Sequence, residues 1–320
     1  MEEDGNVVSI LERILAGDKL ALARAISMVE NEEPGAKDIM KKVHTMSGKS
    51  HIVGITGAPG VGKSTLVNGL IKAFRSEGKR VGVIAVDPTS PFSGGAILGD
   101  RLRMQSHALD PGVFIRSLAT RGYLGGLSKA AGQVIKLLDV YGSEVILVET
   151  VGTGQSEVDI MRYAHTVVVV VAPGLGDEIQ AIKAGILEIG HVFVVNKADR
   201  DGADKTIQEL QFMLDMSREE KAWKPPIIKA VASRGDGLNE VARNVKEHLK
   251  VLQVTGRLTD HMKRAAEFEV RELLIDSLVD NVISRAKAAG EWERIIHRVA
   301  GRDLDPYAAA CRLSRFLRSS

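Results

Sequence analysis

The chain has 320 residues, of which 44% are hydrophobic and 26% are charged, which is enough apolar content for a sizeable core in an ordinary soluble protein. Its net charge is +2 with acidic and basic residues interspersed, which argues against a nucleic-acid-binding surface. The single cysteine, Cys311, excludes an internal disulfide and a cysteine-cluster metal site. The sequence has no apolar run of transmembrane length and it starts with acidic residues. We therefore expect a cytoplasmic protein that makes no membrane contact.

Residues 1–50 are predicted to form a helical N-terminal extension, with helical pattern from residue 6 onward. Asp18 has the side chain of a good N-cap for a helix that Pro34 ends. A shorter helix is predicted over Ala36–Thr45.

Residues 51–250 alternate apolar strands with helices. Several strands are continuous Val/Ile runs, which are typical of strands buried on both faces of a parallel sheet. The alternation predicts an α/β fold, a doubly wound and mainly parallel sheet whose ligand binds at the carboxyl ends of the strands. The predicted strands are His51–Thr56, Arg80–Val86, Val113–Ser117, Glu144–Glu149, Thr166–Val171, His191–Asn196 and Ile227–Val231.

Residues 251–320 are predicted to form a helical C-terminal region without strands. Asp260–Ala288 has the length and the apolar face of a helix that packs on another helix, either within the chain or across a dimer. A last short helix is predicted over Asp303–Phe316, with Pro306 near its first turn.

The first strand is followed by a glycine-rich loop that opens a helix. Its pattern, Gly-x-x-x-x-Gly-Lys-Ser, predicts a phosphate-binding loop in which backbone N–H groups and the helix N-terminus face a polyphosphate. Lys63 is predicted to reach the β- and γ-phosphates during hydrolysis, and the Ser64 hydroxyl is predicted to ligate Mg²⁺. The nucleotide contacts expected here come from Gly57, Ala58, Pro59, Gly60, Val61, Gly62, Lys63, Ser64 and Thr65.

Three acidic residues lie where further Mg²⁺ contacts are expected. Asp87 follows the second strand, and Glu149 stands at the end of the fourth strand, where many nucleotide hydrolases carry an acid. Asp100 lies in a glycine-flanked loop that is expected to order around the γ-phosphate. Taken alone, Asp87 is equally well a helix cap or a turn residue.

The segment that follows Glu149 contains two candidates for sensing the γ-phosphate and for assisting GTP hydrolysis. Gly152 could offer its N–H to this phosphate, and Gln155 is a candidate to orient the attacking water. A glutamine in such a loop is just as often a solvated polar residue.

An Asn-Lys-x-Asp motif ends the sixth strand. The Asp199 carboxylate can accept hydrogen bonds from both N1–H and the amino group of guanine, Asn196 braces the loop, and the Lys197 stem can lie along the base. The loop after the seventh strand adds a backbone N–H that could read guanine O6, from Ser233, Arg234 or Gly235. The motif at a strand end and beside a phosphate loop indicates GTP.

These residues resemble the MeaB/ArgK-type GTPases of the G3E group, within the SIMIBI class of P-loop proteins. The resemblance covers nearly the whole chain. The matching segments are 17–18, 23–26, 30–31, 57–65, 87–90, 94–95, 100–101, 116, 121–126, 149–157, 176–183, 196–199 and 305–307.

The resemblance implies a homodimeric GTPase that escorts an adenosylcobalamin-dependent acyl-CoA mutase, most often methylmalonyl-CoA mutase, together with its adenosyltransferase. Such a protein uses GTP to gate cofactor delivery and to protect or reactivate the mutase. The family pattern implies that Ser64, Asp87, Asp100 and Glu149 surround Mg²⁺. It also implies three switches, over 87–103, 149–157 and 174–183, with Lys183 in the third acting in mutase-stimulated hydrolysis. The alternative interpretation, without a functional role, is that Lys183 is a solvated residue near the start of an ordinary helix.

Two other classes compete with this interpretation. Nickel-insertion GTPases share the core but need His and Cys ligands, whereas the eight histidines here are scattered along the sequence and His107 has no ligand partner nearby. Each histidine is expected to be a surface or packing residue. An ATP-dependent kinase of basic amino-acid transport is the other class, and the motif at Asn196–Asp199 argues against ATP.

Overall fold

A computed structural model describes residues 2–87, 107, 109–119, 129–150, 162–174, 184–216 and 222–317, with the side chains of 2–8, 87, 119, 129 and 184–186 outside the description. These residues divide into two units, Met1–Thr259 and Asp260–Ser320. The first contains the sheet and the N-terminal helices, and the second contains most of the long C-terminal helix and the shorter helices after it.

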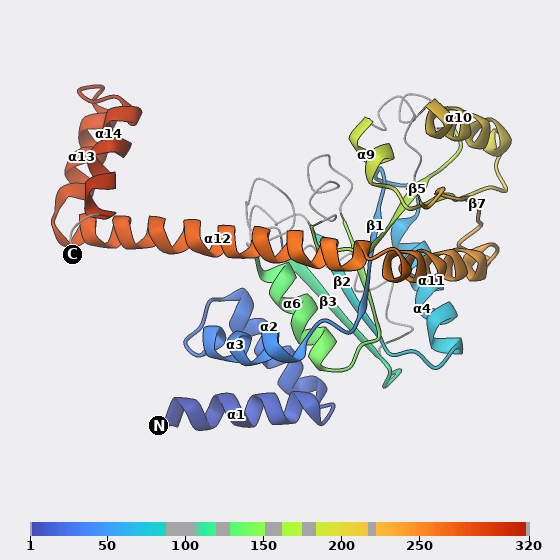
Figure 1. Cartoon of the computed structure of the whole chain (residues 1–320), viewed down its shortest axis with the longest axis horizontal. Coiled ribbons are helices and arrows are strands. Elements are labelled where there is room, and N and C mark those ends of the chain that lie inside the picture. Colours follow the sequence, from blue (N-terminus) through green and yellow to red (C-terminus); the bar gives the residue numbers. More distant parts are fainter. Residues whose placement is uncertain are drawn as a thin grey trace. The chain divides into compact units, whose positions relative to one another are not determined.

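The first unit is built on a parallel seven-stranded sheet in the order β3-β2-β4-β1-β5-β6-β7 (Figure 1). All seven predicted strands are confirmed, with ends that differ by one or two residues. Their bounds are β1 His51–Thr56, β2 Val81–Asp87, β3 Val113–Ala119, β4 Val145–Glu149, β5 Thr166–Val171, β6 Val192–Val195 and β7 Ile227–Lys229. β1 lies between β4 and β5, so the loop after β1 leaves the sheet at its centre, where the direction of the connections changes.

Alternate strand residues enter two separate cores, one on each face of the sheet. Ile146 and Val148 of β4 pack with the helices of one face, and Val145 and Leu147 pack with those of the other. The core on the first face includes residues of α1 Glu2–Leu15, which packs on the next two helices, and of α2 Lys19–Glu30, α3 Ala36–Met46, α6 Lys129–Val140, α9 Ala184–Ile189 and α10 Ala203–Met216. The second is covered by α4 Lys63–Ser76 and α11 Leu238–Val254 (Figure 1). The strands are thus buried on both sides, which explains their continuous apolar sequences.

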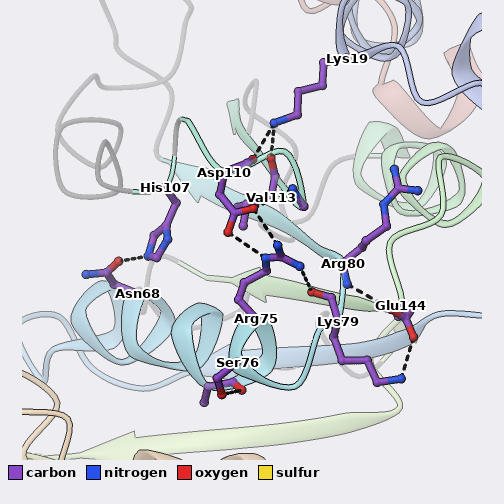
Figure 2. A network of polar contacts seen from close by, with 12 residues as sticks. Lys19, Asn68, Arg75, Ser76, Lys79, Arg80, His107, Asp110, Val113 and Glu144 are labelled. Carbon is purple, nitrogen blue, oxygen red and sulfur yellow. Dashed lines mark hydrogen bonds and ion pairs between the residues drawn. The ribbon is translucent and has the colours of Figure 1, made fainter.

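The N-terminal helices are anchored to the sheet domain by polar contacts at the amino end of β3. Arg75 of α4 pairs with both carboxylate oxygens of Asp110, at 2.8 and 2.9 Å, and this hydrogen bonding lowers the pKa of Asp110 below its ordinary value. Figure 2 shows Lys19 of α2 pointing at the same segment, where its Nζ donates to the carbonyls of Asp110 and Val113 at 2.8 and 2.9 Å. One short segment therefore ties α2 to α4.

The other end of α2 is also held. Arg116 of β3 donates to Ser27 Oγ at 3.2 Å and forms an ion pair with the Glu30 carboxylate. The start of α2 is capped as predicted, because the Asp18 carboxylate accepts the N–H groups of residues 20 and 21 at 2.8 and 3.1 Å.

The second unit consists of α12 Arg257–Ala288, α13 Glu291–Ala300, α14 Pro306–Leu313 and a 3₁₀ turn over Ser314–Leu317. α12 confirms the long predicted helix and starts three residues earlier. α13 was not predicted, although Trp292, Ile295 and Val299 have helical spacing. α14 begins later than the predicted helix because Asp305 is its N-cap and accepts the Ala308 N–H at 2.9 Å.

Candidate functional site

The loop over Gly57–Gly62 joins β1 to α4 and has three glycines with positive φ. These are Gly57 at 140°, Gly60 at 81° and Gly62 at 97°. At Gly57 a Cβ atom would lie 2.1 Å from the Val170 carbonyl oxygen of β5, so only glycine fits between the loop and that strand. Close packing on β5 therefore sets where the loop leaves β1.

Lys63 is the first residue of α4 and lies across this loop. Its side chain is buried, and its Nζ donates to the carbonyls of Gly57 and Ala58 at 2.6 and 3.0 Å. The cap residue Gly62 has no side chain to occupy the helix N-terminus. The first-turn N–H groups and the ammonium thus converge on one side of the loop, which suits a bound phosphate.

Ser64 and Glu149 meet at the carboxyl ends of β1 and β4. Ser64 Oγ donates to Glu149 Oε1 at 2.7 Å, and the Glu149 residue is only 5% exposed. A hydroxyl and a buried carboxylate are hard oxygen donors of the kind that Mg²⁺ prefers, so this pair fits the ion chemically.

The remaining predicted Mg²⁺ contacts can be followed only in part. Asp87 is the last residue of β2, two positions beyond Ala85, which lies opposite Glu149 in the neighbouring strand. Its backbone is thus at the same sheet edge, while its side chain lies outside the described residues, as does Asp100. Among the described residues, no group of three or more His, Cys, Asp or Glu side chains is arranged to hold a metal ion.

The Asn-Lys-x-Asp segment follows β6 and is braced against two other loops. Asn196 is buried; its Nδ2 donates to the Val61 carbonyl at 2.8 Å and its Oδ1 accepts the Ala232 N–H at 3.0 Å. Lys197 has a φ of 56° and donates from Nζ to the Gly60 carbonyl at 2.6 Å. This motif therefore ties the phosphate loop to the loop after β7.

The predicted guanine-reading groups lie on these two adjoining loops. The Asp199 carboxylate is about half exposed and stands 4.0 Å from the Arg234 guanidinium. Arg234 lies in a turn that the Val231–Asp236 bridge closes, together with exposed Ser233 and with Gly235, whose φ is 88°. The structure brings Asp199 and this turn together, as a site for a base edge requires.

Several predicted site residues lie outside the described part of the chain. They are Gly152, Gln155 and Lys183, in addition to Asp100. The switches predicted over 87–103, 149–157 and 174–183 are likewise described only at their ends.

A buried threonine pair was missed by sequence reasoning. Thr150 follows Glu149, and its hydroxyl lies 3.2 Å from the hydroxyl of Thr56, the residue that precedes the phosphate loop. Both residues are almost fully buried. The sequence did contain a signal for this pair, because each threonine lies at the end of a buried strand and directly beside a nucleotide-binding motif.

Comparison with known proteins agrees with this geometry. The profile of the family described as "Methylmalonyl Co-A mutase-associated GTPase MeaB" matches residues 22–287. The chain belongs to the MeaB family. A Pyrococcus horikoshii protein named as a GTPase is 55% identical over 304 residues, which cover 94% of this chain and 95% of that protein.

Two further similar proteins extend the comparison to an animal and to a crystal structure. The methylmalonic aciduria type A homolog of Caenorhabditis elegans mitochondria is 29% identical over 307 residues, covering 88% of this chain and 74% of that protein. The crystal structure of a LAO/AO transport system kinase matches with a TM-score of 0.73 at 23% identity, over 98% of both chains, and supports the fold.

Family membership makes the chain a P-loop GTPase that binds guanine nucleotides and hydrolyses GTP. In the part of the chain that the structure describes, no helix combines the length and the apolar character needed to cross a bilayer.

Proposed function

We propose that this GTPase is a chaperone for an adenosylcobalamin-dependent acyl-CoA mutase, with methylmalonyl-CoA mutase as the client. It would use GTP binding and hydrolysis to gate delivery of the cofactor and to protect or reactivate the mutase, in contact with the adenosyltransferase. The family match over residues 22–287 carries this proposal, because that family is described by its association with methylmalonyl-CoA mutase. The similarity to a methylmalonic aciduria type A homolog supports it.

Within the nucleotide site, we propose roles for the residues that the sequence motifs predict. Lys63 and the first turn of α4 bind the phosphates, while Asp199 and the 233–235 turn read guanine. Ser64 and Glu149, with Asp87 and Asp100, hold Mg²⁺, which when bound neutralises charge on the phosphates. Gln155 orients the attacking water.

Coupling to the mutase is proposed to run through residues 174–183, which follow β5. β5 contacts the phosphate loop directly, because Gly57 packs against the Val170 carbonyl. A segment attached to this strand can therefore respond to the nucleotide. Lys183 would carry that response to the mutase.

Binding of a purified methylmalonyl-CoA mutase tests this function directly. We expect the mutase to bind in the presence of a GTP analogue and to accelerate GTP hydrolysis. Lys183→Ala should reduce this acceleration more than it reduces hydrolysis by the GTPase alone. No binding and no acceleration, with GTP hydrolysis intact, would reject the chaperone role while leaving the GTPase assignment standing.

A homodimer is proposed to form through α12. Six aliphatic side chains in its middle, Val270, Leu273, Leu274, Ile275, Leu278 and Val279, are between 42% and 64% exposed in the single chain. A helix with apolar side chains on so much of its surface is normally covered, and a second copy of the chain would bury them. Residues 251–320 would then act as the dimerisation region.

The competing classes receive less support from the described residues. The Asn-Lys-x-Asp motif favours GTP over the ATP of a transport-system kinase, and the bracing of its loop by Asn196 and the place of Asp199 beside Arg234 support this. A nickel-insertion GTPase needs cysteine ligands for the metal that it transfers. This chain has a single cysteine, Cys311, which is exposed.

A further inference from the structure

Four of the eight histidines, scattered in the sequence, gather on one side of the sheet domain. His51 begins β1, His165 directly precedes β5, His191 directly precedes β6, and His248 lies on α11. The rings of His51 and His165 stack with centroids 6.2 Å apart, and those of His191 and His248 with centroids 4.1 Å apart. We call these four residues the histidine ladder.

Two of these rings accept hydrogen bonds from the backbone of the neighbouring strand. The Ile52 N–H donates to His165 Nδ1 at 3.2 Å, and the Val167 N–H donates to His191 Nδ1 at 3.0 Å. A ring nitrogen that accepts a hydrogen bond carries no proton. Both rings are therefore neutral, with the proton on Nε2.

The other two rings share one buried hydroxyl. Thr166 Oγ1 lies 2.8 Å from His51 Nε2 and 2.9 Å from His248 Nδ1, and all three residues are at most 5% exposed. Neutral rings satisfy this hydroxyl, since it can donate to one ring and accept from the other. The ladder is thus a polar cluster in which each of these hydrogen bonds suits an uncharged imidazole.

Burial and the neighbouring rings both oppose a positive charge in the ladder. Burial lowers the pKa of His51 to about 3, with the charge of His165 as a further cause. Burial, together with the charges of His191, His51 and His165, lowers the pKa of His248 to about 2. The described ionisable residues within three positions of the ladder in sequence are exposed, apart from the partly buried Lys246: Lys49, Arg162, Glu188, Glu247 and Lys250. Lys246 forms an ion pair with Glu77.

Each strand in the ladder leads to part of the nucleotide site. β1 ends at the phosphate loop, β6 ends at Asn196, and β5 supplies the Val170 carbonyl against which Gly57 packs. If the amino ends of these strands lost their order, the strands would no longer hold the phosphate loop and Asn196 in place.

We propose that the histidine ladder is an acid-sensitive lock on the amino ends of β1, β5 and β6, closed while its rings are neutral and opened when they take up protons. Protonation of His165 or His191 removes an acceptor from a backbone N–H, and protonation of stacked neighbours puts like charges 4.1 Å apart. This device goes beyond the proposed function and does not depend on the mutase.

The sign of the effect follows from proton linkage. In the unfolded chain a histidine titrates near pH 6.5, whereas the buried rings of the folded protein stay neutral far below that pH. The ladder's contribution to stability is complete above about pH 6.5 and is lost as the pH falls below it. Each fully buried ring should raise the unfolding equilibrium constant about fivefold between pH 6.5 and 5.5, and about tenfold per pH unit further below.

Trp223 offers a local reporter for the test. Its indole N–H donates to the His191 carbonyl at 2.7 Å, and its ring meets His248 edge-on with centroids 5.2 Å apart. The chain has two tryptophans, so Trp292→Phe leaves Trp223 alone. In this background, urea unfolding followed by tryptophan fluorescence at about pH 7.5, 6.5 and 5.5 measures the equilibrium constant.

We expect the constant to rise about thirtyfold between pH 6.5 and 5.5 in the background protein, from the two fully buried rings. His248→Gln, whose amide oxygen can still accept from Thr166, should make that rise about fivefold smaller. If His248→Gln does not fold, His51→Gln, which removes the other fully buried ring, answers the same question. His297→Gln, on the exposed face of α13, is the matched control and should change nothing. Equal pH dependence in the background and the ladder variant would overturn the proposal, as would an equal change in the control.

Discussion

Replacing Asn196 with alanine should damage stability and nucleotide binding together. The buried side chain satisfies two backbone groups from different loops, the Val61 carbonyl at 2.8 Å and the Ala232 N–H at 3.0 Å. Asn196→Ala leaves both without this partner in a site with little access to water. A buried polar group that loses its partner costs about 1–3 kcal/mol, so the two together should lower the free energy of unfolding by about 2–6 kcal/mol.

Nucleotide affinity should fall in the same variant, because Val61 and Ala232 belong to the two loops that face phosphate and base. We expect GDP to bind at least ~10-fold more weakly by titration calorimetry, while urea unfolding reports the stability loss. Asn244→Ala is the matched control, since Asn244 is only partly buried and makes one hydrogen bond, from Nδ2 to the Glu240 carbonyl at 2.9 Å. A loss below ~1 kcal/mol with unchanged GDP affinity would refute the role of Asn196 as the brace between the loops.

Three further outcomes are expected. Asp199→Asn should weaken GTP binding by about 2–4 kcal/mol, because charge-assisted hydrogen bonds are lost, and should improve binding of xanthosine triphosphate relative to GTP. If competition binding shows that the unmodified protein binds ATP as tightly as GTP, the guanine assignment is wrong. Lys63→Ala should abolish GTP hydrolysis with an unchanged circular dichroism spectrum, and retained turnover would remove Lys63 from the mechanism. Replacing Leu274 and Leu278 with glutamate should give a folded monomer by light scattering, because both side chains are exposed in the single chain, and a dimer of unchanged affinity would exclude α12 from the interface.

Local patterns were sufficient to predict the strands and the nucleotide motifs. The runs at Thr166–Val171 and Val192–Val195 are apolar throughout, apart from the leading threonine, and such runs form strands that are buried on both faces of a sheet. The phosphate loop is a local structure as well, because its glycines and the start of α4 are adjacent in the chain. The capping role of Asp18 depends on the next three residues only, and it was predicted for the same reason.

The missed α13 and the late start of α14 show the limit of such patterns at helix ends. Asp303 and Asp305 can both begin a helix, and the cap at Asp305 is decided by the packing of α14 on α13. Pro306 at the first helical position favours Asp305 over Asp303 as the cap, and the predicted start did not use this signal.

Only the tertiary structure decided which distant residues meet. Ser64 and Glu149 are 85 positions apart, and they touch because β1 and β4 are neighbours in the sheet. Asn196 reaches Val61 across 135 positions because only β5 separates β6 from β1 in the sheet. The histidine ladder depends on the strand order β1-β5-β6 and on α11, and nothing in the separate positions of His51, His165, His191 and His248 reveals it. Periodicity reports which face of an element is buried, whereas contacts between elements follow from strand order, which short-range pattern does not encode.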